Sequence, residues 1–288
     1  MLGALAAQAP VTLRVLSANI GNNDLHCSRY VFKLCLKSVE DRVRESVRAL
    51  APEVVALQEI STAAQCEKKR GRSARKVCAA QNRTEAEEQT RRILGPDYTI
   101  AITQGRYEAI AVKVSAGTIK GCAPGAICWT EFLPELPQGC DPGFSVSAVD
   151  AALKGRAVRI VNLHPDSVKS RCRALELEQG FALASGPQNL LLGDWNTDPY
   201  HYQGEDVQVW RREVKQRRLT VHSGLAEHDP PYFTDLVPWP WPDKTLDHVL
   251  SDFASGSCVT LGVAPGTKRL DDHGDLDHRG QLCELTMP

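Results

Sequence analysis

The sequence predicts an α/β fold in which two β-sheets pack against each other and helices flank them. Strand-like apolar runs alternate with helical patterns along the chain, and several strand-like runs follow one another directly, which is typical of a two-sheet α/β sandwich. The chain has 288 residues, enough to bury a large core, and no Pro-, Ser- or Gly-rich linker divides it. We therefore expect a single domain over residues 11–288.

Strand-like segments carry polar side chains at or next to one end. They are residues 13–21, 53–59, 157–164, 189–192, 245–250 and 281–285. Each contains apolar residues in a run or in alternation, and the polar tips include Asn19, Glu59 and His164. Polar groups at the ends of buried strands gather at the edge of a sheet, where binding and catalytic residues are common.

Four segments have helical patterns. The apolar residues of the first fall on one helical face: Val39, Val43, Val47 and Leu50. Ser38 with Asp41 predicts a capping pair at the start of that helix. Further helices are expected near residues 84–94, 169–184 and 205–218.

The segment Gly193-Asp194-Trp195-Asn196 ends an apolar strand on a carboxylate and a carboxamide. Side chains on a strand alternate between faces, so Asp194 and Asn196 project from the same side and reach one site. Asn162 and His164 have the same spacing at the end of another strand. An Asx-rich turn would also explain the first segment alone, but the repeated polar tips favour a shared site.

Six polar motifs occur in order along the chain. They are Asn19, Gln58-Glu59, Asn162-Leu163-His164, Gly193-Asp194-Trp195-Asn196, Leu246-Asp247-His248-Val249 and Asp277-His278-Arg279. In this order the motifs resemble the endonuclease/exonuclease/phosphatase superfamily, the group of pancreatic deoxyribonuclease and the apurinic endonucleases, over about residues 13–286. The resemblance implies a four-layer α/β/β/α sandwich of two packed, mainly antiparallel β-sheets flanked by helices.

The residue types suit hydrolysis of a phosphodiester. That reaction needs a nucleophilic water, neutralisation of charge on the phosphoryl oxygens and help for the departing alkoxide, and a hard divalent cation supplies the second and often the third. We expect Mg²⁺, with Mn²⁺ or Ca²⁺ as alternatives, because magnesium prefers oxygen ligands. Glu59 is the first expected ligand, Asn19 adds a carbonyl oxygen, and Asp277 completes or supports the shell. A turn-capping role for Asn19 remains the alternative.

Histidines are the expected proton-transfer groups, because their unperturbed pKa lies close to neutral pH. The resemblance pairs His164 with Glu108 and His278 with Asp247, and such a carboxylate fixes the tautomer and orientation of an imidazole. His278 would assist the water or bind the scissile phosphate, while His164 would serve the opposite side of the displacement. Which of the two is the base and which the acid is left open.

Three further side chains complete the expected catalytic set. Asp194 orients the nucleophilic water or its histidine, and Asn196 and Asn162 donate amide hydrogens to the phosphate. The last motif has an alternative register, because the pair Asp272-His273 stands five residues before Asp277-His278. We prefer the later pair, since a strand-like run follows it.

The ten cysteines predict disulfides in an oxidising compartment. Their count is even and no Cys-x-x-Cys pair occurs, which argues against a zinc cluster. The first ten residues are apolar and small, and Ala7-Gln8-Ala9 has the pattern of an export-signal cleavage site. We expect a secreted or extracytoplasmic protein, with residues 1–10 as the remnant of an export signal or as a disordered N-terminus.

Charge does not identify a partner. The 34 basic and 35 acidic residues leave a formal net charge of -1, which gives no strong bulk attraction to nucleic acid. Two local features keep two interpretations each. The basic segment between Cys66 and Cys78 either binds phosphates or is a solvated loop. The segment Pro238-Trp239-Pro240-Trp241-Pro242 either inserts into a membrane or is a rigid loop with packed tryptophans. No run approaches the ~18 apolar residues needed to cross a membrane, so no transmembrane segment is expected.

The expected function is a secreted, magnesium-dependent phosphodiester hydrolase, a deoxyribonuclease-like endonuclease of low sequence specificity with DNA as substrate. The motif at His164 together with the ten cysteines favours this type. A phosphomonoesterase or a phospholipid headgroup hydrolase of inositol-phosphate or sphingomyelin type is the alternative, because the catalytic residues would hardly differ. A non-enzymatic or toxin-type subunit that retains the fold is the second alternative.

Overall fold

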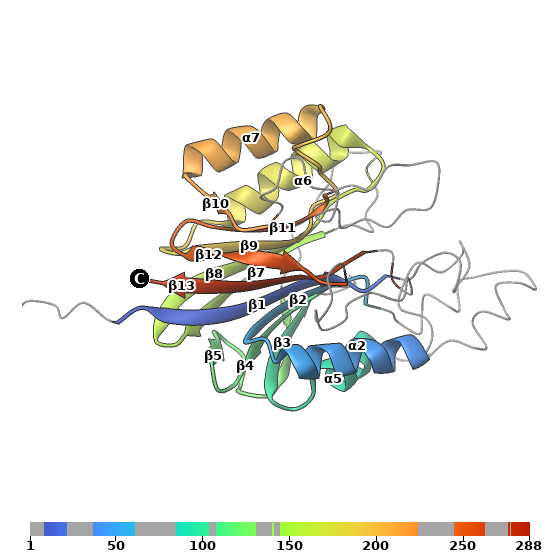
Figure 1. Ribbon diagram of the computed structural model, residues 1–288, viewed down its shortest axis with the longest axis vertical. Helices are drawn as coiled ribbons and strands as arrows, with labels where there is room; N and C mark the ends of the chain where they lie inside the picture. Colours follow the sequence, from blue (N-terminus) through green and yellow to red (C-terminus); the bar gives the residue numbers. More distant parts are fainter. Residues whose placement is uncertain are drawn as a thin grey trace, which may run out of the picture.

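Two β-sheets pack face to face, and a pair of helices covers the outer face of each (Figure 1). This computed structural model describes residues 9–21, 37–60, 85–103, 108–130, 140, 145–223, 245–262, 276 and 278–288. The predicted four-layer α/β/β/α sandwich is confirmed.

The first sheet has seven strands. They are β12 (Ser255–Thr260), β13 (Gln281–Met287), β1 (Val11–Asn19), β2 (Val54–Gln58), β4 (Ala109–Lys113), β3 (Tyr98–Thr103) and β6 (Ile127–Thr130), in the order of their pairing. β1 is parallel to β2 and β3 is parallel to β6, whereas the other neighbours are antiparallel. The sheet is therefore mixed but mainly antiparallel.

The second sheet has six strands. They are β10 (Thr220–Val221), β11 (Asp247–Ser251), β9 (Asn189–Asp194), β8 (Arg156–His164), β7 (Ser145–Leu153) and β5 (Gly117–Ile119), again in pairing order. β8 and β9 are its one parallel pair among the described strands. The carboxyl ends of the parallel pair β1–β2 and of the parallel pair β8–β9 meet at one edge of the sandwich.

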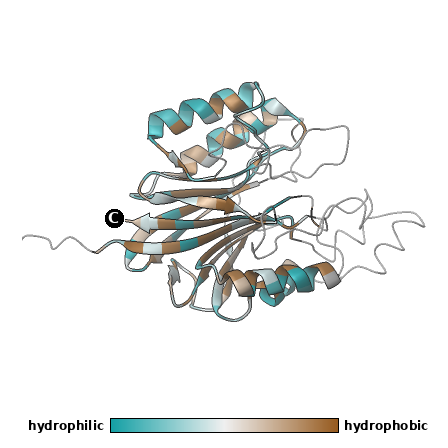
Figure 2. Cartoon of the chain, viewed as in Figure 1, coloured by the Kyte–Doolittle hydropathy of each residue, from teal (hydrophilic) through white to brown (hydrophobic). Residues whose placement is uncertain are grey.

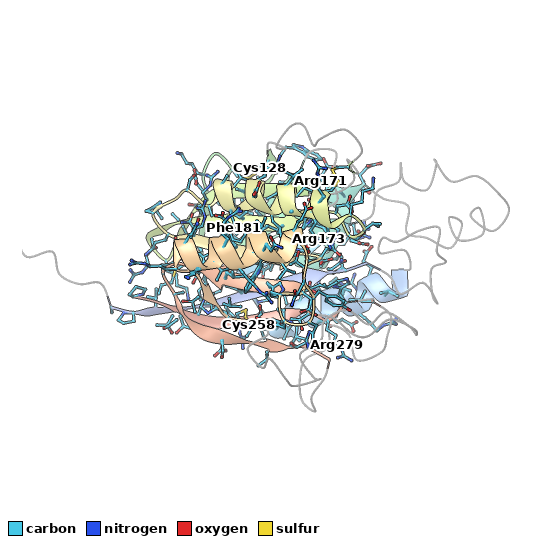
Figure 3. All side chains as sticks on the ribbon, turned by 90° about the horizontal axis from the view of Figure 1, so that it is seen from above. Cys128, Arg171, Arg173, Phe181, Cys258 and Arg279 are labelled. Atoms are coloured by element: carbon cyan, nitrogen blue, oxygen red, sulfur yellow. A yellow bond between two sulfur atoms is a disulfide. The ribbon has the colours of Figure 1, made fainter. Side chains whose placement is uncertain are left out.

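Two pairs of helices complete the layers. They are α2 (Lys37–Leu50) and α5 (Ala86–Leu94) on the seven-stranded sheet, and α6 (Ser170–Leu183) and α7 (Glu205–Arg217) on the six-stranded sheet. Figure 2 shows hydrophilic residues on the outward sides of α2 and α7. Figure 3 shows α6 and α7 side by side, with Phe181 of α6 labelled; its ring lies 5.5 Å from that of Trp195.

The predicted helices are present, with one difference at the start of α2. The expected apolar face of α2 is buried: Val39, Val43, Val47 and Leu50. Lys37 is already helical, so Ser38 lies inside the helix and is not its N-cap, contrary to the predicted capping pair. Asp41 instead forms an ion pair of 2.8 Å with Arg44. The sequence pattern identified the buried face correctly but placed the first turn too late.

The layer between the sheets is apolar at one end and polar at the other. Its apolar part is supplied by alternate residues of the facing strands, including Leu13, Val15, Val54, Ile160, Leu190, Val249 and Leu285. Continuing the same alternation toward the carboxyl ends of β1, β2, β8 and β9 brings Asn19, Gln58, His164 and Asp194 onto this inner face. The fold thus delivers polar side chains to one end of an otherwise apolar layer.

The six described cysteines form three disulfides. They are Cys122–Cys128, Cys140–Cys172 and Cys258–Cys283. The basic segment between Cys66 and Cys78, the Pro238–Pro242 segment and residues 1–8 lie outside the described residues. Among the described helices, none combines the length and apolar character required to cross a bilayer.

Candidate active site

The polar side chains converge because strand direction brings their backbone positions to the same edge. Asn19, Gln58, His164 and Asp194 are the last residues of β1, β2, β8 and β9. Strands β4, β11 and β13 run the other way, so their amino ends lie at this edge, and Glu108, Asp247 and His278 stand at or just before those ends. Seven strands from two sheets therefore supply a single cluster.

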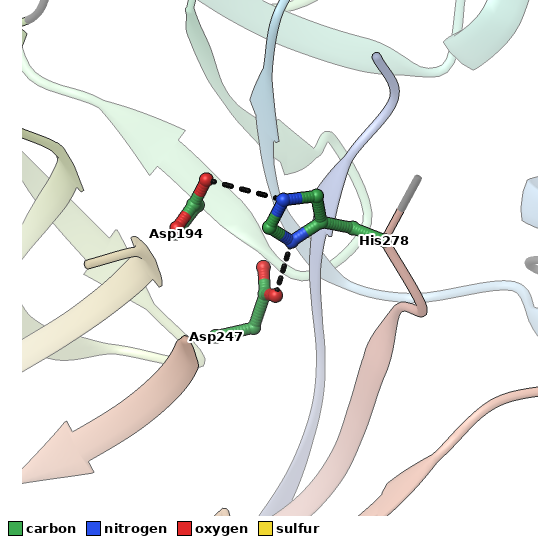
Figure 4. A group of neighbouring side chains, drawn as sticks. All are labelled: Asp194, Asp247 and His278. Carbon is green, nitrogen blue, oxygen red and sulfur yellow. Dashed lines mark hydrogen bonds and ion pairs between the residues drawn. The ribbon is translucent and has the colours of Figure 1, made fainter. Parts of the chain in front are cut away.

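His278 forms a close pair with Asp247, and its ring also faces Asp194 (Figure 4). Its Nδ1 atom lies 2.7 Å from Oδ2 of Asp247, and its Nε2 atom lies 3.6 Å from Oδ2 of Asp194. All three residues are buried. Asp247 orients the ring so that Nε2 points toward Asp194.

His164 forms a second arrangement of this kind at the same oxygen atom of Asp194. Its Nδ1 atom lies 3.2 Å from Oε1 of Glu108, and its Nε2 atom lies 3.6 Å from Oδ2 of Asp194. The same Nε2 lies 3.7 Å from Oε1 of Glu59. Each of the two imidazoles thus contacts a carboxylate through Nδ1 and directs its Nε2 atom at the same oxygen atom of Asp194.

Asp194 is the centre of the cluster, and its environment alters its protonation. Burial raises the pKa of its carboxyl from 3.8 to about 7, and the negative charge of Asp247 also raises it. The charge of His278 and the hydrogen bonds from Asn196 and Asn19 lower this pKa, but by less than burial raises it. Asn19 Nδ2 donates to Asp194 Oδ2 at 3.0 Å, and the main-chain N–H of Asn196 donates to Oδ1 at 2.9 Å. A group with this pKa changes charge near neutral pH.

Backbone strain occurs at two of the predicted site residues. Glu59 has φ 62° and Asn196 has φ 48°, both in the left-handed region that side-chain-bearing residues seldom adopt. The Asn196 amide donates to the carbonyl of Pro165 at 2.9 Å and to Asp194 Oδ2 at 3.4 Å. Such strain is typical of functional sites, where the surrounding structure holds it in place.

A glycine allows β8 and β9 to approach closely beside the site. Gly193 has φ 138°, and a Cβ atom there would lie 2.1 Å from the carbonyl oxygen of Leu163. Leu163 precedes His164, and Gly193 precedes Asp194. The glycine of the Gly-Asp-Trp-Asn motif therefore has a packing role that brings the two site residues together.

Of the predicted metal ligands, Asn19 makes hydrogen bonds to protein groups and Asp277 lies outside the described residues. Asn19 Oδ1 accepts a hydrogen bond of 2.8 Å from the main-chain N–H of Gly21, in addition to the bond that its amide gives to Asp194. Asp277 and the alternative pair Asp272-His273 lie outside the described residues. Within the described part of the chain, ligand atoms of Asp194, Asp247 and His278 lie within 4.8 Å of one another and could hold a metal ion.

The side chain of Asn162 bonds to groups of the protein itself. It accepts a hydrogen bond of 2.7 Å from Gln58 Nε2, and its amide donates to the carbonyl oxygens of Leu57 and Ala109 at 3.3 and 3.5 Å. These partners all belong to the opposite sheet. The amide assigned to a phosphate is thus engaged with protein groups.

Sequence reasoning gave no role to two nearby groups. Gln58 was visible only as the residue before Glu59, although its position on the same strand face as Ala56 predicts an inward side chain. Asp198 and His201 form a third acid–imidazole pair, with Nδ1 of His201 2.8 Å from Oδ2 of Asp198. The spacing of three residues in a turn was a signal for that pair.

Comparison with known proteins identifies the fold. No protein-family model and no curated protein matches the chain. An endonuclease/exonuclease/phosphatase family protein from Bacteroides thetaiotaomicron superposes with a TM-score of 0.62 at 16% identity, covering 98% of this chain and 100% of that one. A second such protein, from Bacteroides vulgatus, gives 0.61 at 14% identity, covering 96% and 100%. The human Nocturnin catalytic domain, solved with a bound sulfate anion, gives 0.59 at 15% identity, covering 97% of both chains.

Proposed function

We propose that this chain, which has the fold of the endonuclease/exonuclease/phosphatase proteins, is a metal-dependent phosphoesterase. The observation that carries the proposal is the pair of carboxylate-oriented imidazoles, His164 and His278, whose Nε2 atoms both lie 3.6 Å from Asp194 Oδ2. Two oriented proton-transfer groups next to a buried acid suit a displacement at phosphorus, which needs proton transfer at the entering and the leaving oxygen.

The donor set fits a hard divalent cation. Glu59, Glu108, Asp194 and Asp247 bring four carboxyl groups into one largely buried cluster, and a bound cation would offset the cost of burying their negative charge. We retain Glu59, Asn19 and Asp277 as proposed ligands of Mg²⁺, because Asp247 is already bonded to His278. When bound, the cation would neutralise charge on the phosphoryl oxygens.

The protein's own residues have distinct proposed roles. His278, oriented by Asp247, and His164, oriented by Glu108, hold or transfer protons at Nε2 on opposite sides of the reacting phosphate. Asp194 orients the nucleophilic water or its histidine. We assign to Asn196 the donation of an amide hydrogen to a phosphate oxygen, in place of its longer bond of 3.4 Å to Asp194 Oδ2.

At the finer level we infer a secreted deoxyribonuclease-like endonuclease of low sequence specificity, with DNA as its substrate. The carboxylate-held His164 supports this type. The three disulfides support an oxidising, extracytoplasmic location, since disulfides seldom persist in a reducing cytosol.

Plasmid nicking tests the proposal. Supercoiled DNA is incubated with Mg²⁺ and with the wild-type protein or the variants His164→Ala and Asp194→Ala, and a parallel series contains a chelator. We expect nicking by the wild type with Mg²⁺ alone and a loss of at least about 100-fold in both variants. Equal nicking by all three proteins would refute the assigned site.

A substrate panel separates the alternatives. Linear DNA, RNA, phosphoinositides and sphingomyelin are each tested with and without chelator. Hydrolysis of a lipid or of a phosphomonoester without nicking would select the headgroup or phosphomonoesterase class. Absence of turnover on the whole panel, together with no Mg²⁺ binding by calorimetry, would select a non-enzymatic or toxin-type subunit.

A further inference from the structure

One buried amide pair joins the two sheets directly beneath the candidate active site. Gln58 Nε2, at the end of β2, donates to Asn162 Oδ1, near the end of β8, at 2.7 Å. Asn162 Nδ2 donates in turn to the main-chain carbonyls of Leu57 and Ala109 at 3.3 and 3.5 Å. A single side chain of the six-stranded sheet therefore bonds to two strands of the seven-stranded sheet.

The bonded positions adjoin three residues of the active site. Leu57 and Gln58 immediately precede Glu59, and Ala109 immediately follows Glu108. Asn162 stands two residues before His164 on β8, so both side chains project from the same face of that strand. The amide of Asn162 thus ties the segments carrying Glu59 and Glu108 to the strand carrying His164, and both acids lie within 3.7 Å of that ring.

The surroundings make this connection specific. Asn162 and Gln58 are fully buried, and the inner layer next to them is apolar. A polar group buried without a partner is unfavourable, so a shift of one sheet against the other is penalised when it separates the amides. An apolar pair of similar size would fill the same space without selecting one register.

We propose that the Asn162–Gln58 pair is a positioning device that fixes the relative register of the two sheets at the active site, holding Glu59 and Glu108 against His164. The consequence for catalysis rests on the proposed phosphoesterase function. The positional claim rests on the hydrogen bonds alone, and the two are separable by experiment. Asn162 accordingly acts through its neighbours and is a positioning residue without contact to the substrate.

A double replacement tests whether the pair acts through position or only through stability. Asn162→Leu and Gln58→Met each leave an unpaired amide or carbonyl, so each single variant should be destabilised. The combined variant Q58M/N162L removes both amides and should recover most of the lost melting temperature. We expect kcat to remain about 10- to 100-fold below wild type, with KM changed less than kcat. Recovery of kcat to within threefold of wild type would overturn the proposal.

A control variant lies in the same layer. Ser147 is the partner of Asn162 in the β7–β8 register and is equally buried, and its hydroxyl has no hydrogen bond to the described residues. Ser147→Ala should leave both kcat and melting temperature near wild-type values. A loss of kcat in Ser147→Ala as large as in Q58M/N162L would show that any change in this layer impairs the site, and would overturn the specific role of the amides.

An independent readout keeps the positional claim testable when no substrate is turned over. Nitrogen-edited NMR detects the ring proton of His164 that the Glu108 contact shields from solvent exchange. We expect this signal in the wild type and its loss or broadening in Q58M/N162L, while the signal of His278 persists. An unchanged His164 signal would overturn the proposal. Should the double variant fail to fold, Gln58→Met alone is measured in the same way, because it removes only the bond between the side chains; an unchanged His164 signal there has the same meaning.

Discussion

The Nε2 atom of His278 lies 3.6 Å from Oδ2 of Asp194, whose carboxyl is fully buried. Burial raises the pKa of this carboxyl to about 7, so the folded protein binds a proton there that the unfolded chain releases above pH 3.8. The contribution of this group to the free energy of unfolding is therefore complete below pH 3.8 and is lost as the pH rises through about 7. The charged form of Asp194 destabilises the metal-free protein.

Asp194→Asn should raise the melting temperature of the metal-free protein above neutral pH. The variant cannot ionise, so it avoids the cost of the buried charge that the wild type carries at pH 8. We expect its melting temperature to exceed that of the wild type by several degrees at pH 8, with a smaller difference at pH 5. Calorimetric scans in chelator at both pH values measure this, and an equal difference at the two pH values contradicts it.

Asp247→Asn should lower kcat by at least about 100-fold with little change in KM. The carboxylate holds Nδ1 of His278 at 2.7 Å, and a carboxamide there stabilises the wrong tautomer and removes the charge that supports the imidazolium. Asp252→Asn is the matched control, because Asp252 follows the opposite end of β11 and bonds to Asn189. The kcat and KM values of the two variants are measured by steady-state kinetics on a substrate that the wild-type protein hydrolyses. Activity of Asp247→Asn at the control's level would remove Asp247 from the site.

Chelation should abolish activity, and added Mg²⁺ should restore it. Because a proton on Asp194 removes negative charge beside the proposed ion, the apparent Mg²⁺ affinity should weaken by up to about tenfold per pH unit as the pH falls below about 7. Isothermal titration at pH 6, 7 and 8 follows the affinity. In Asp194→Asn this dependence should be reduced, and an identical slope in both proteins would exclude Asp194 from the linkage.

His248 should make the protein sensitive to acid. Its ring is buried, donates from Nε2 to the carbonyl of Thr197 at 2.9 Å and lies 5.9 Å from the ring of Trp195. Burial lowers the pKa of His248, against a smaller opposing effect of the Thr197 bond and of Asp198 and Asp247 nearby. The unfolded chain therefore binds the proton first, and stability is lost as the pH falls below about 6.5.

His248→Gln tests this effect. The variant should lose less of its own melting temperature between pH 7 and pH 5 than the wild type does, even if it starts from a lower value at pH 7. Burial lowers the pKa of His222 as well, so part of the wild-type slope should remain. Parallel curves for the two proteins would show that His248 does not contribute.

Gly193→Ala should destabilise the protein by about 3 kcal/mol or more. The added methyl group would overlap the carbonyl of Leu163 at 2.1 Å and would force apart the strands that carry His164 and Asp194. Gly155→Ala is the control, since Gly155 also has a positive φ, 83°, but nothing lies within 4 Å of its Cβ position. Urea denaturation compares the two variants. We expect Gly155→Ala to lose about 1 kcal/mol of unfolding free energy. If Gly193→Ala loses no more than this control, the close contact between β8 and β9 at Gly193 is contradicted.

The sequence carried more information about the elements than about their contacts. Helices expected near residues 84–94 and 205–218 are observed as Ala86–Leu94 and Glu205–Arg217, because apolar spacing and strand ends are local properties of the chain. Because side chains alternate between the two faces of a strand, the sequence also predicts that Asp194 points to the same face as Leu190 and Leu192. Such patterns also sufficed to identify which strand ends bear polar groups.

Contacts between the sheets could not be predicted in the same way. That Asn162 bonds to Gln58 and to two carbonyls depends on how one sheet is set against the other, which no periodicity within a strand encodes. The Asp198–His201 pair is local in sequence but was not distinguishable from an ordinary turn. Sequence reasoning therefore predicted that Asn19, His164, Asp194 and His278 lie close together, but not all of their hydrogen-bond partners.

The left-handed backbone of Glu59 has a consequence for how this protein responds to selection. A non-glycine residue in that conformation costs about 1 to 2 kcal/mol, which Glu59→Gly would relieve while deleting the carboxylate proposed to bind the cation. Screening a mutant library for heat resistance alone would thus enrich variants with glycine at position 59, which lack the proposed metal ligand and the activity that depends on it. Any thermostable version of this protein should be evolved under a requirement for turnover.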